Sequence, residues 1–199
     1  SQHWDRGWGF APVGHTLFLF LVDDPRRPYT ILLEEELDGS LVKGYQHTGY
    51  FSRKYTSDAE HWGADGQFEL NRTANHRVIR FSDVLLMAAE LDSPNKQDYL
   101  DRVRARVGLD PVPATLENIF RERRLELSLE GIRYYDVLRR GLAYATQEFT
   151  YSGITGPNYE SDDQIIYDAT FNAATKGFLP IPQTEIDLSG GAFVQNDGY

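Results

Sequence analysis

The most regular pattern of apolar and charged residues lies between residues 116 and 142. Its apolar positions recur mostly three, four or seven residues apart, as they do on one face of an amphipathic helix. Gly131 interrupts this spacing, and a glycine costs about 1 kcal/mol relative to alanine inside a helix. The pattern therefore predicts two helices that meet near Gly131, the second over roughly 132–147. The apolar positions are Leu116, Ile119, Phe120, Leu127, Tyr134, Tyr135, Leu138 and Leu142.

Two further helices are predicted just before this segment, over residues 79–91 and 95–107. Gly108 suits the end of the second, and Thr115 suits the N-cap of the next helix. The two helical hairpins begin about 37 residues apart, near the 34-residue spacing of tetratricopeptide repeats. Residue identity between the hairpins is weak, so the pattern predicts an array of helical hairpins without a demonstrated repeat. The face predicted for the first helix comprises Phe81, Val84, Leu85, Ala88 and Leu91.

The remaining segments are less regular and predict a mostly α-helical fold with long loops and a few short strands. Thr16–Val22 is apolar and fits either a strand or two helical turns, while Tyr29–Leu33 favours a strand. Phe149–Ala174 is interpreted as loop and Phe178–Pro182 as a short extended piece. We expect a single unit with three regions: a loop-rich region over 1–77, helical hairpins over 78–147, and a loop-rich C-terminal region over 148–199.

Composition narrows the function classes. The 199 residues carry a net charge of −10, so a nucleic-acid phosphate backbone or an anionic membrane surface would be repelled. The chain has no cysteine, which excludes disulfides, thiol catalysis and cysteine-based metal sites. The longest apolar run, Leu17–Val22, is far shorter than the ~20 residues that span a bilayer. The opening Ser1, with no methionine or leader, indicates part of a longer protein.

No catalytic or metal motif stands out. The five histidines are scattered and form no HxH or HxxxH pair, and no nucleotide-binding or nucleophile motif is present. We therefore expect no metal, no cofactor and no catalytic residue. Glu126 and Glu130, four apart on a helix and flanked by Arg123 and Arg133, fit an ion-pair network that holds helices in register; an acid–base pair would have the same spacing.

Aromatic residues in polar, glycine-rich segments are the candidate ligand contacts. A flat ring in a loop can stack on the apolar face of a sugar, because aromatic side chains offer a large area with a defined geometry. The alternative is that these rings cover the protein core. The candidate ligand-binding residues are Trp4, Trp8, His61, Trp62 and Tyr159.

Four motifs give the chain a family resemblance. Arg80–Glu90 reads RFSDVLLMAAE, Val103–Leu109 reads VRARVGL, Glu122–Gly141 reads ERRLELSLEGIRYYDVLRRG, and Leu179–Tyr199 reads LPIPQTEIDLSGGAFVQNDGY. In this order they resemble the C-terminal part of the SusD/RagB family of outer-membrane nutrient-binding lipoproteins of Bacteroidetes. The chain departs from the family pattern at Gly190-Gly191 and Asp197, which stand in place of Asn-Pro and Pro. Weaker support comes from Asp24-Pro25-Arg26 and Arg53-Lys54-Tyr55.

The resemblance implies a non-catalytic protein built on tetratricopeptide-like helix pairs. It implies surface binding of oligosaccharide or peptide nutrients on the extracellular face of the outer membrane, and delivery to a SusC-like TonB-dependent transporter. It also implies an N-terminal lipid anchor and first helix pairs that lie outside this chain. The matched charges are expected to hold the fold together: Arg80, Asp83, Glu90, Arg104, Glu126, Glu130, Arg133 and Asp136.

Three functions stay open from the sequence. The favoured one is binding of glycans, with binding of peptides for the same kind of transporter as its alternative. A helical scaffold whose main role is to dock a protein partner would share the hairpin array. A glycoside hydrolase would need two carboxylates facing each other across a cleft, and no motif proposes that pair.

Overall fold

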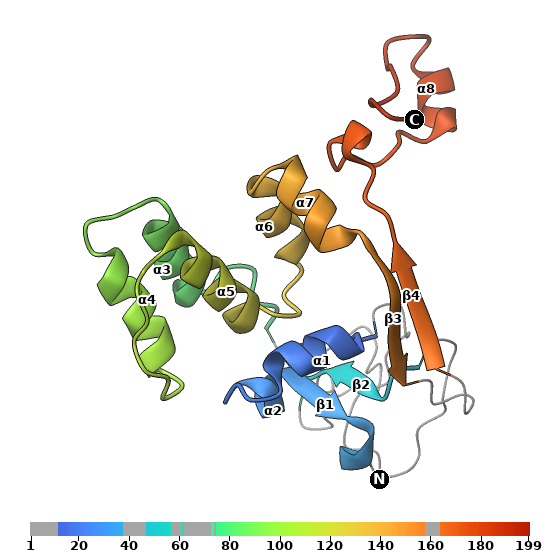
Figure 1. The fold of residues 1–199 in the computed structure, drawn as a ribbon. Coiled ribbons are helices and arrows are strands. Elements are labelled where there is room, and N and C mark those ends of the chain that lie inside the picture. The colour runs from blue at the N-terminus through green and yellow to red at the C-terminus, as the bar shows by residue number, and fades with distance from the viewer. Residues whose placement is uncertain (1–11, 38–46, 57–60, 62–72, 74, 158–163) are drawn as a thin grey trace. The chain divides into compact units, whose positions relative to one another are not determined.

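The computed structural model describes residues 12–37, 47–56, 61, 73, 75–157 and 164–199 (Figure 1). Within these residues the chain forms eight α-helices, α1 to α8, and two sheets of two strands each. The mostly α-helical fold with a few short strands is therefore as predicted. The contacts divide the chain into two compact units, one formed by Ser1–Arg133 with Thr155–Ile165 and the other by Tyr134–Ile154 with Ile166–Tyr199. The predicted grouping of all residues in one domain of three regions stays a prediction.

The first unit begins with a small helix-and-strand segment. The apolar run that fitted either a strand or two helical turns is helical, and part of the predicted strand at 29–33 belongs to a helix begun by a proline in its first turn. Strands β1 and β2 pair antiparallel, with Leu32 opposite Phe51. Leu21, Ile31 and Leu125 pack together in one apolar cluster. The elements are α1 (His15–Leu21), α2 (Arg27–Thr30), β1 (Ile31–Leu33), a 3-10 turn (Glu34–Glu36) and β2 (Tyr50–Ser52).

Three helices follow within the same unit and confirm the predicted segments. The Thr115 side chain accepts a hydrogen bond from the Asn118 backbone N–H at 3.2 Å, so Thr115 is the N-cap that its type suggested. Gly108 has a φ of +75°, the left-handed conformation expected just beyond a helix. Leu86, Leu100 and Ile119, one from each helix, join a shared core. The helices are α3 (Phe81–Glu90), α4 (Lys96–Ala105) and α5 (Leu116–Glu126).

The predicted buried face of α3 was wrong in part. Leu85 is buried as expected, but Leu86 and Ala89 complete the buried face, whereas Phe81 is 64% exposed and Leu91 is 83% exposed. The helix is apolar on nearly all sides, so spacing alone did not determine which side meets α4 and α5. The contacts with neighbouring helices select the buried side.

The second unit differs most from the sequence-based expectation. The single helix predicted over 132–147 is two short helices, because Gly141 between them has a φ of +96°. The segment interpreted as loop holds a two-stranded sheet, and the region predicted to be loop-rich over 148–199 also contains a helix near its end. The elements are α6 (Arg133–Arg139), α7 (Leu142–Phe149), β3 (Tyr151–Pro157), β4 (Gln164–Ala169), a 3-10 turn (Ala173–Thr175) and α8 (Gln183–Leu188).

A close backbone approach holds the second unit together. The Tyr134 hydroxyl donates a hydrogen bond to the Gly177 carbonyl at 2.6 Å. A Cβ at Gly177 would lie 2.7 Å from the Leu138 methyl groups, so only glycine fits there without movement. Over the described residues of both units, no helix is long and apolar enough to cross a membrane.

Candidate functional site

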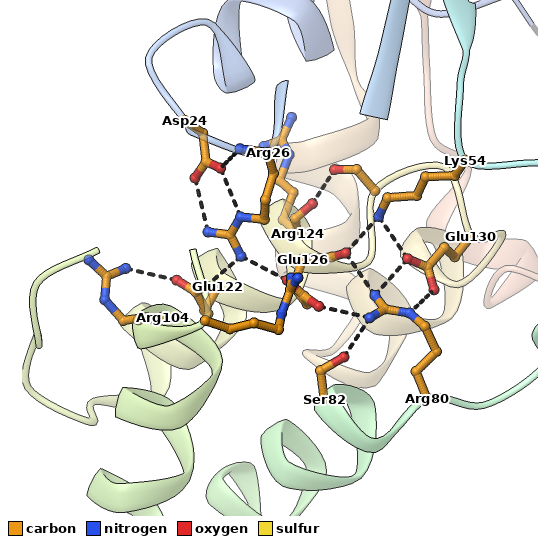
Figure 2. A network of polar contacts seen from close by, with 12 residues as sticks. Asp24, Arg26, Lys54, Arg80, Ser82, Arg104, Glu122, Arg124, Glu126 and Glu130 are labelled. Carbon is orange, nitrogen blue, oxygen red and sulfur yellow. Dashed lines mark hydrogen bonds and ion pairs between the residues drawn. The ribbon is translucent and has the colours of Figure 1, made fainter. Parts of the chain in front are cut away.

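Three glutamates spaced four residues apart form the centre of a buried ionic network in the first unit (Figure 2). Glu122 and Glu126 lie on α5, and Glu130 lies in the turn that follows it. The side chains of Glu122 and Glu126 are each 1% exposed, so an unpaired charge there would be strongly destabilising. We refer to these three residues as the glutamate ladder.

Arg26 joins the N-terminal segment to the ladder. Its Nη1 donates to Glu122 at 2.6 Å and to Glu126 at 3.1 Å. Its Nε and Nη2 donate hydrogen bonds to the two oxygens of the Asp24 carboxylate at 2.8 and 2.9 Å, which is the bidentate geometry that a guanidinium favours. Arg104 of α4 donates to the other Glu122 oxygen at 2.8 Å. Both oxygens of Glu122 are thereby bound by cations from different elements.

Arg80 and Lys54 complete the other end of the ladder. Arg80, which precedes α3, donates to Glu126 at 2.8 Å and to the two Glu130 oxygens at 2.7 and 2.9 Å. Lys54 donates to Glu130 at 2.7 Å and to the Glu126 backbone carbonyl at 2.6 Å. Arg106, just after α4, donates to Glu126 at 2.6 Å. The predicted fold-holding role is confirmed for Arg80, Glu126 and Glu130.

The electrostatics keep the ladder ionised. Burial alone would raise the pKa of Glu126, but hydrogen bonds and charge from Arg80 and Arg106 outweigh it and lower that pKa to about 2. Burial likewise opposes ionisation of Glu130, yet Arg80 and Lys54 lower its pKa below the ordinary value. Burial lowers the pKa of Lys54, although Glu130 acts in the opposite direction.

These pKa directions bear on the acid–base alternative for Glu126 and Glu130. A general acid needs a pKa near the working pH, raised above the ordinary carboxyl value. Both carboxylates are shifted the other way and already hold several hydrogen bonds each. The arrangement therefore supports the ion-pair interpretation. In the part of the chain that the structure describes, no group of three or more histidines or carboxylates is placed to hold a metal ion.

A pocket of about 660 Å³ opens beside the ladder, within the first unit. This volume lies within the range of about 300–1,000 Å³ that small-molecule sites occupy. Glu126 and Glu130 form part of its wall, together with five cationic side chains and the rings of Tyr29 and Tyr55. We call it the basic pocket, and its lining residues are Pro25, Arg26, Tyr29, Thr30, Lys54, Tyr55, Arg77, Arg80, Arg106, Val107, Glu126 and Glu130.

The predicted ligand contacts are mostly beyond what the structure describes. Trp4, Trp8, Trp62 and Tyr159 lie outside the described residues. His61 is described and exposed, and its backbone carbonyl accepts a hydrogen bond from the Thr73 N–H at 2.9 Å. The role of these five residues in ligand binding stays a prediction.

Sequence reasoning did not assign the basic pocket. Two short motifs that supported only the family resemblance, Asp24-Pro25-Arg26 and Arg53-Lys54-Tyr55, supply part of its wall. Tyr29, Arg77 and Arg106 carried no signal, because their common location depends on tertiary contacts between segments up to about 77 residues apart.

Comparisons with known proteins show which family the chain resembles in sequence and in structure. A sequence profile described as the SusD family matches residues 35–199, and the predicted resemblance is thereby confirmed. No curated protein matches the chain. A solved structure named "Laminarin binding SusD-like protein" is 36% identical with a TM-score of 0.78, over 98% of this chain and 40% of its own. This likeness also confirms the predicted tetratricopeptide-like helical fold class.

Two further solved structures are similar. Surface glycan-binding protein A from Bacteroides thetaiotaomicron is 34% identical with a TM-score of 0.77, over 99% of this chain and 43% of its own. Surface glycan-binding protein A from Bacteroides uniformis is 29% identical with a TM-score of 0.75, over 96% and 42%. The chain thus spans about two fifths of the length of these structures. These names describe binding proteins, which agrees with the prediction of a binding protein that is not an enzyme.

Proposed function

The chain belongs to the SusD family, and we propose that it takes part in non-catalytic binding of oligosaccharides at the cell surface. The observation that carries this proposal is the likeness, over nearly the whole chain, to two structures named for glycan binding, at 34–36% identity. The buried ladder supports it, because carboxylates fixed in ion pairs serve a scaffold and not acid catalysis.

We further propose that the protein works on the extracellular face of the outer membrane and delivers its ligand to a SusC-like TonB-dependent transporter. The family assignment supports this setting. Affinity purification of the tagged protein from detergent-solubilised outer membranes tests the partnership. We expect a β-barrel transporter to co-purify, and its absence under conditions that retain other membrane complexes would refute the delivery step.

Calorimetric titration tests ligand binding directly. The purified protein should bind at least one member of a panel that includes laminarin fragments, other neutral oligosaccharides and acidic oligosaccharides. Trp62→Ala should weaken that binding about tenfold or more, since loss of a stacking ring removes a main contact. Phe193→Ala removes a half-exposed ring from a segment with no proposed ligand role, and should leave binding unchanged.

The panel also separates the alternatives. Binding of peptides without any binding of sugars would replace the glycan proposal with peptide uptake. A transporter that co-purifies, with neither ligand class bound, would favour a docking scaffold. Release of sugars from any oligosaccharide by the purified protein would contradict the non-catalytic function.

A further inference from the structure

The basic pocket has a charge opposite to that of the chain as a whole. The protein carries a net charge of −10, yet cations outnumber carboxylates in the pocket wall. A cleft lined by one sign of charge between low-dielectric walls concentrates ligands of the opposite sign. The charged lining residues are Arg26, Lys54, Arg77, Arg80 and Arg106 on the cationic side and Glu126 and Glu130 on the anionic side.

The cations of the pocket fall into an inner and an outer group. The inner group forms ion pairs with the carboxylates of the glutamate ladder at 2.6–3.1 Å and comprises Arg26, Lys54 and Arg80. Arg77 and Arg106 form the outer group. The exposed Arg77 donates to the Lys54 backbone carbonyl at 2.7 Å, a partner that carries no net charge. Arg106 touches Glu126 with one nitrogen, while its side chain is 56% exposed.

One of the outer arginines, Arg77, lies beside an aromatic ring. The Arg77 guanidinium sits 5.3 Å from the centroid of the Tyr55 ring, and the Tyr55 hydroxyl donates to the Arg77 carbonyl at 3.1 Å. Tyr29, on the same pocket wall, is 75% exposed. A ring at this exposure is largely in contact with solvent, and its face is available for stacking. The pocket therefore combines charged donors with flat apolar surfaces.

We infer that the basic pocket is a binding site for an acidic sugar, in which Arg77 and Arg106 bind carboxylate or sulfate groups and the rings of Tyr29 and Tyr55 contact the sugar. The inference rests on the glycan-binding function proposed above and names the ligand class of this site. A guanidinium presents a planar pair of donors that matches a carboxylate or sulfate, and such charge-assisted bonds are stronger than neutral ones. The exposed ring of Tyr29 favours a sugar ring over a small inorganic anion.

Matched ligands provide the first test. Calorimetric titration of the purified protein compares an oligogalacturonide with the same oligogalacturonide after methyl esterification, and a sulfated galactose oligosaccharide with its unsulfated counterpart. Esterification removes the charge and keeps the sugar, so it should weaken binding at least about tenfold. Whichever of the two acidic ligands binds more tightly identifies the group that the arginines prefer. Its affinity should fall as salt is raised, because exposed charges are screened.

Single substitutions locate the site. Arg77→Gln and Arg106→Gln should each weaken binding of the acidic ligand at least about tenfold while leaving the methyl ester unaffected. Glu126 keeps Arg26 and Arg80 as partners in the Arg106 variant, so thermal unfolding should show that both variants fold. Arg102→Gln, which removes an exposed arginine outside the pocket, is the matched control and should bind as the parent does.

The outcomes separate this inference from the proposed function. Binding of neutral oligosaccharides with no preference for acidic ones would overturn the inference and leave the glycan-binding function standing. Acidic binding that is unchanged in both arginine variants would also overturn it, since the ligand would then bind elsewhere. Failure to bind any sugar would refute both the inference and the proposed function.

Discussion

Replacing Glu126 with glutamine removes one charge from the most buried part of the glutamate ladder while keeping the side-chain shape. The Glu126 carboxylate is 1% exposed and accepts hydrogen bonds from Arg26, Arg80 and Arg106 at 2.6–3.1 Å. An amide cannot neutralise three guanidinium groups, and its own N–H donors meet those of the arginines. We therefore expect E126Q to be markedly less stable than the parent protein.

Two estimates of the size of this effect agree. The pKa of Glu126 is lowered from 4.5 to about 2, and each unit corresponds to about 1.36 kcal/mol, so ionisation of this group contributes about 3 kcal/mol to the free energy of unfolding. Removing one partner of a buried ion pair costs about 3–5 kcal/mol in other proteins. We expect E126Q to lower the free energy of unfolding by about 3–5 kcal/mol at pH 7.

The stability difference between the parent protein and E126Q should depend on pH in a defined direction. Because the pKa of Glu126 is lower in the folded state, its contribution is fully present above about pH 4.5 and is lost as the pH falls towards 2. The difference between the parent protein and E126Q should therefore be constant from pH 7 to about 5 and shrink below that. In the variant, this part of the acid destabilisation should be missing.

Urea unfolding followed by circular dichroism measures both quantities, at pH 7 and at intervals down to pH 2.5. Glu35→Gln is the matched control: Glu35 is exposed, and its replacement should change the free energy of unfolding by less than about 0.5 kcal/mol. A loss below about 1 kcal/mol in E126Q at pH 7 would refute the reasoning. A larger loss that stays the same down to pH 2.5 would show that charge is not its cause.

Four further substitutions test the packing within each of the two units. Gly177→Ala should destabilise the protein by about 1–3 kcal/mol, because a Cβ there would lie 2.7 Å from Leu138 methyl groups; Gly190→Ala, with a similar positive φ but open space around it, should cost less, and equal losses would contradict the steric argument. Leu86→Ala should cost about 2–5 kcal/mol through a cavity, whereas Thr115→Ala should cost about 1 kcal/mol through loss of a helix cap. Thermal unfolding checks this order, and a larger loss in the Thr115 variant would reverse it.

Helices α3, α4 and α5 of the first unit could be predicted because their ends carry local signals. Thr115 caps α5 through its own side chain, and Gly108 adopts a positive φ beyond α4, so residue type alone marks both positions. Gly141 marks a helix boundary in the same way, but the apolar spacing continues across it from Leu138 to Leu142. Periodicity therefore predicted one helix where the backbone makes two.

The partners of the glutamate ladder could be predicted only in part from the sequence. The spacing of Glu126 and Glu130 predicted ion pairs, and the flanking arginines 123 and 133 were the nearest candidates. The structure pairs these glutamates with Arg26, Lys54, Arg80 and Arg106, which lie 20–100 residues away along the chain. Helical spacing specifies which charges share a face, whereas the identity of their partners depends on which other elements pack against that face.

The ladder and the basic pocket together divide the cations of this region into two roles. The inner arginines are held by carboxylates that remain ionised to about pH 2 at Glu126, so their charge stabilises the fold and is largely compensated. Arg77 is bound through a backbone carbonyl, so its charge is left for a ligand. We therefore expect substitutions of the ladder to change stability at neutral pH, and substitutions of Arg77 to change ligand affinity without unfolding the protein. A scaffold charge and a ligand-binding charge can thus lie on one pocket wall and still be separated by experiment.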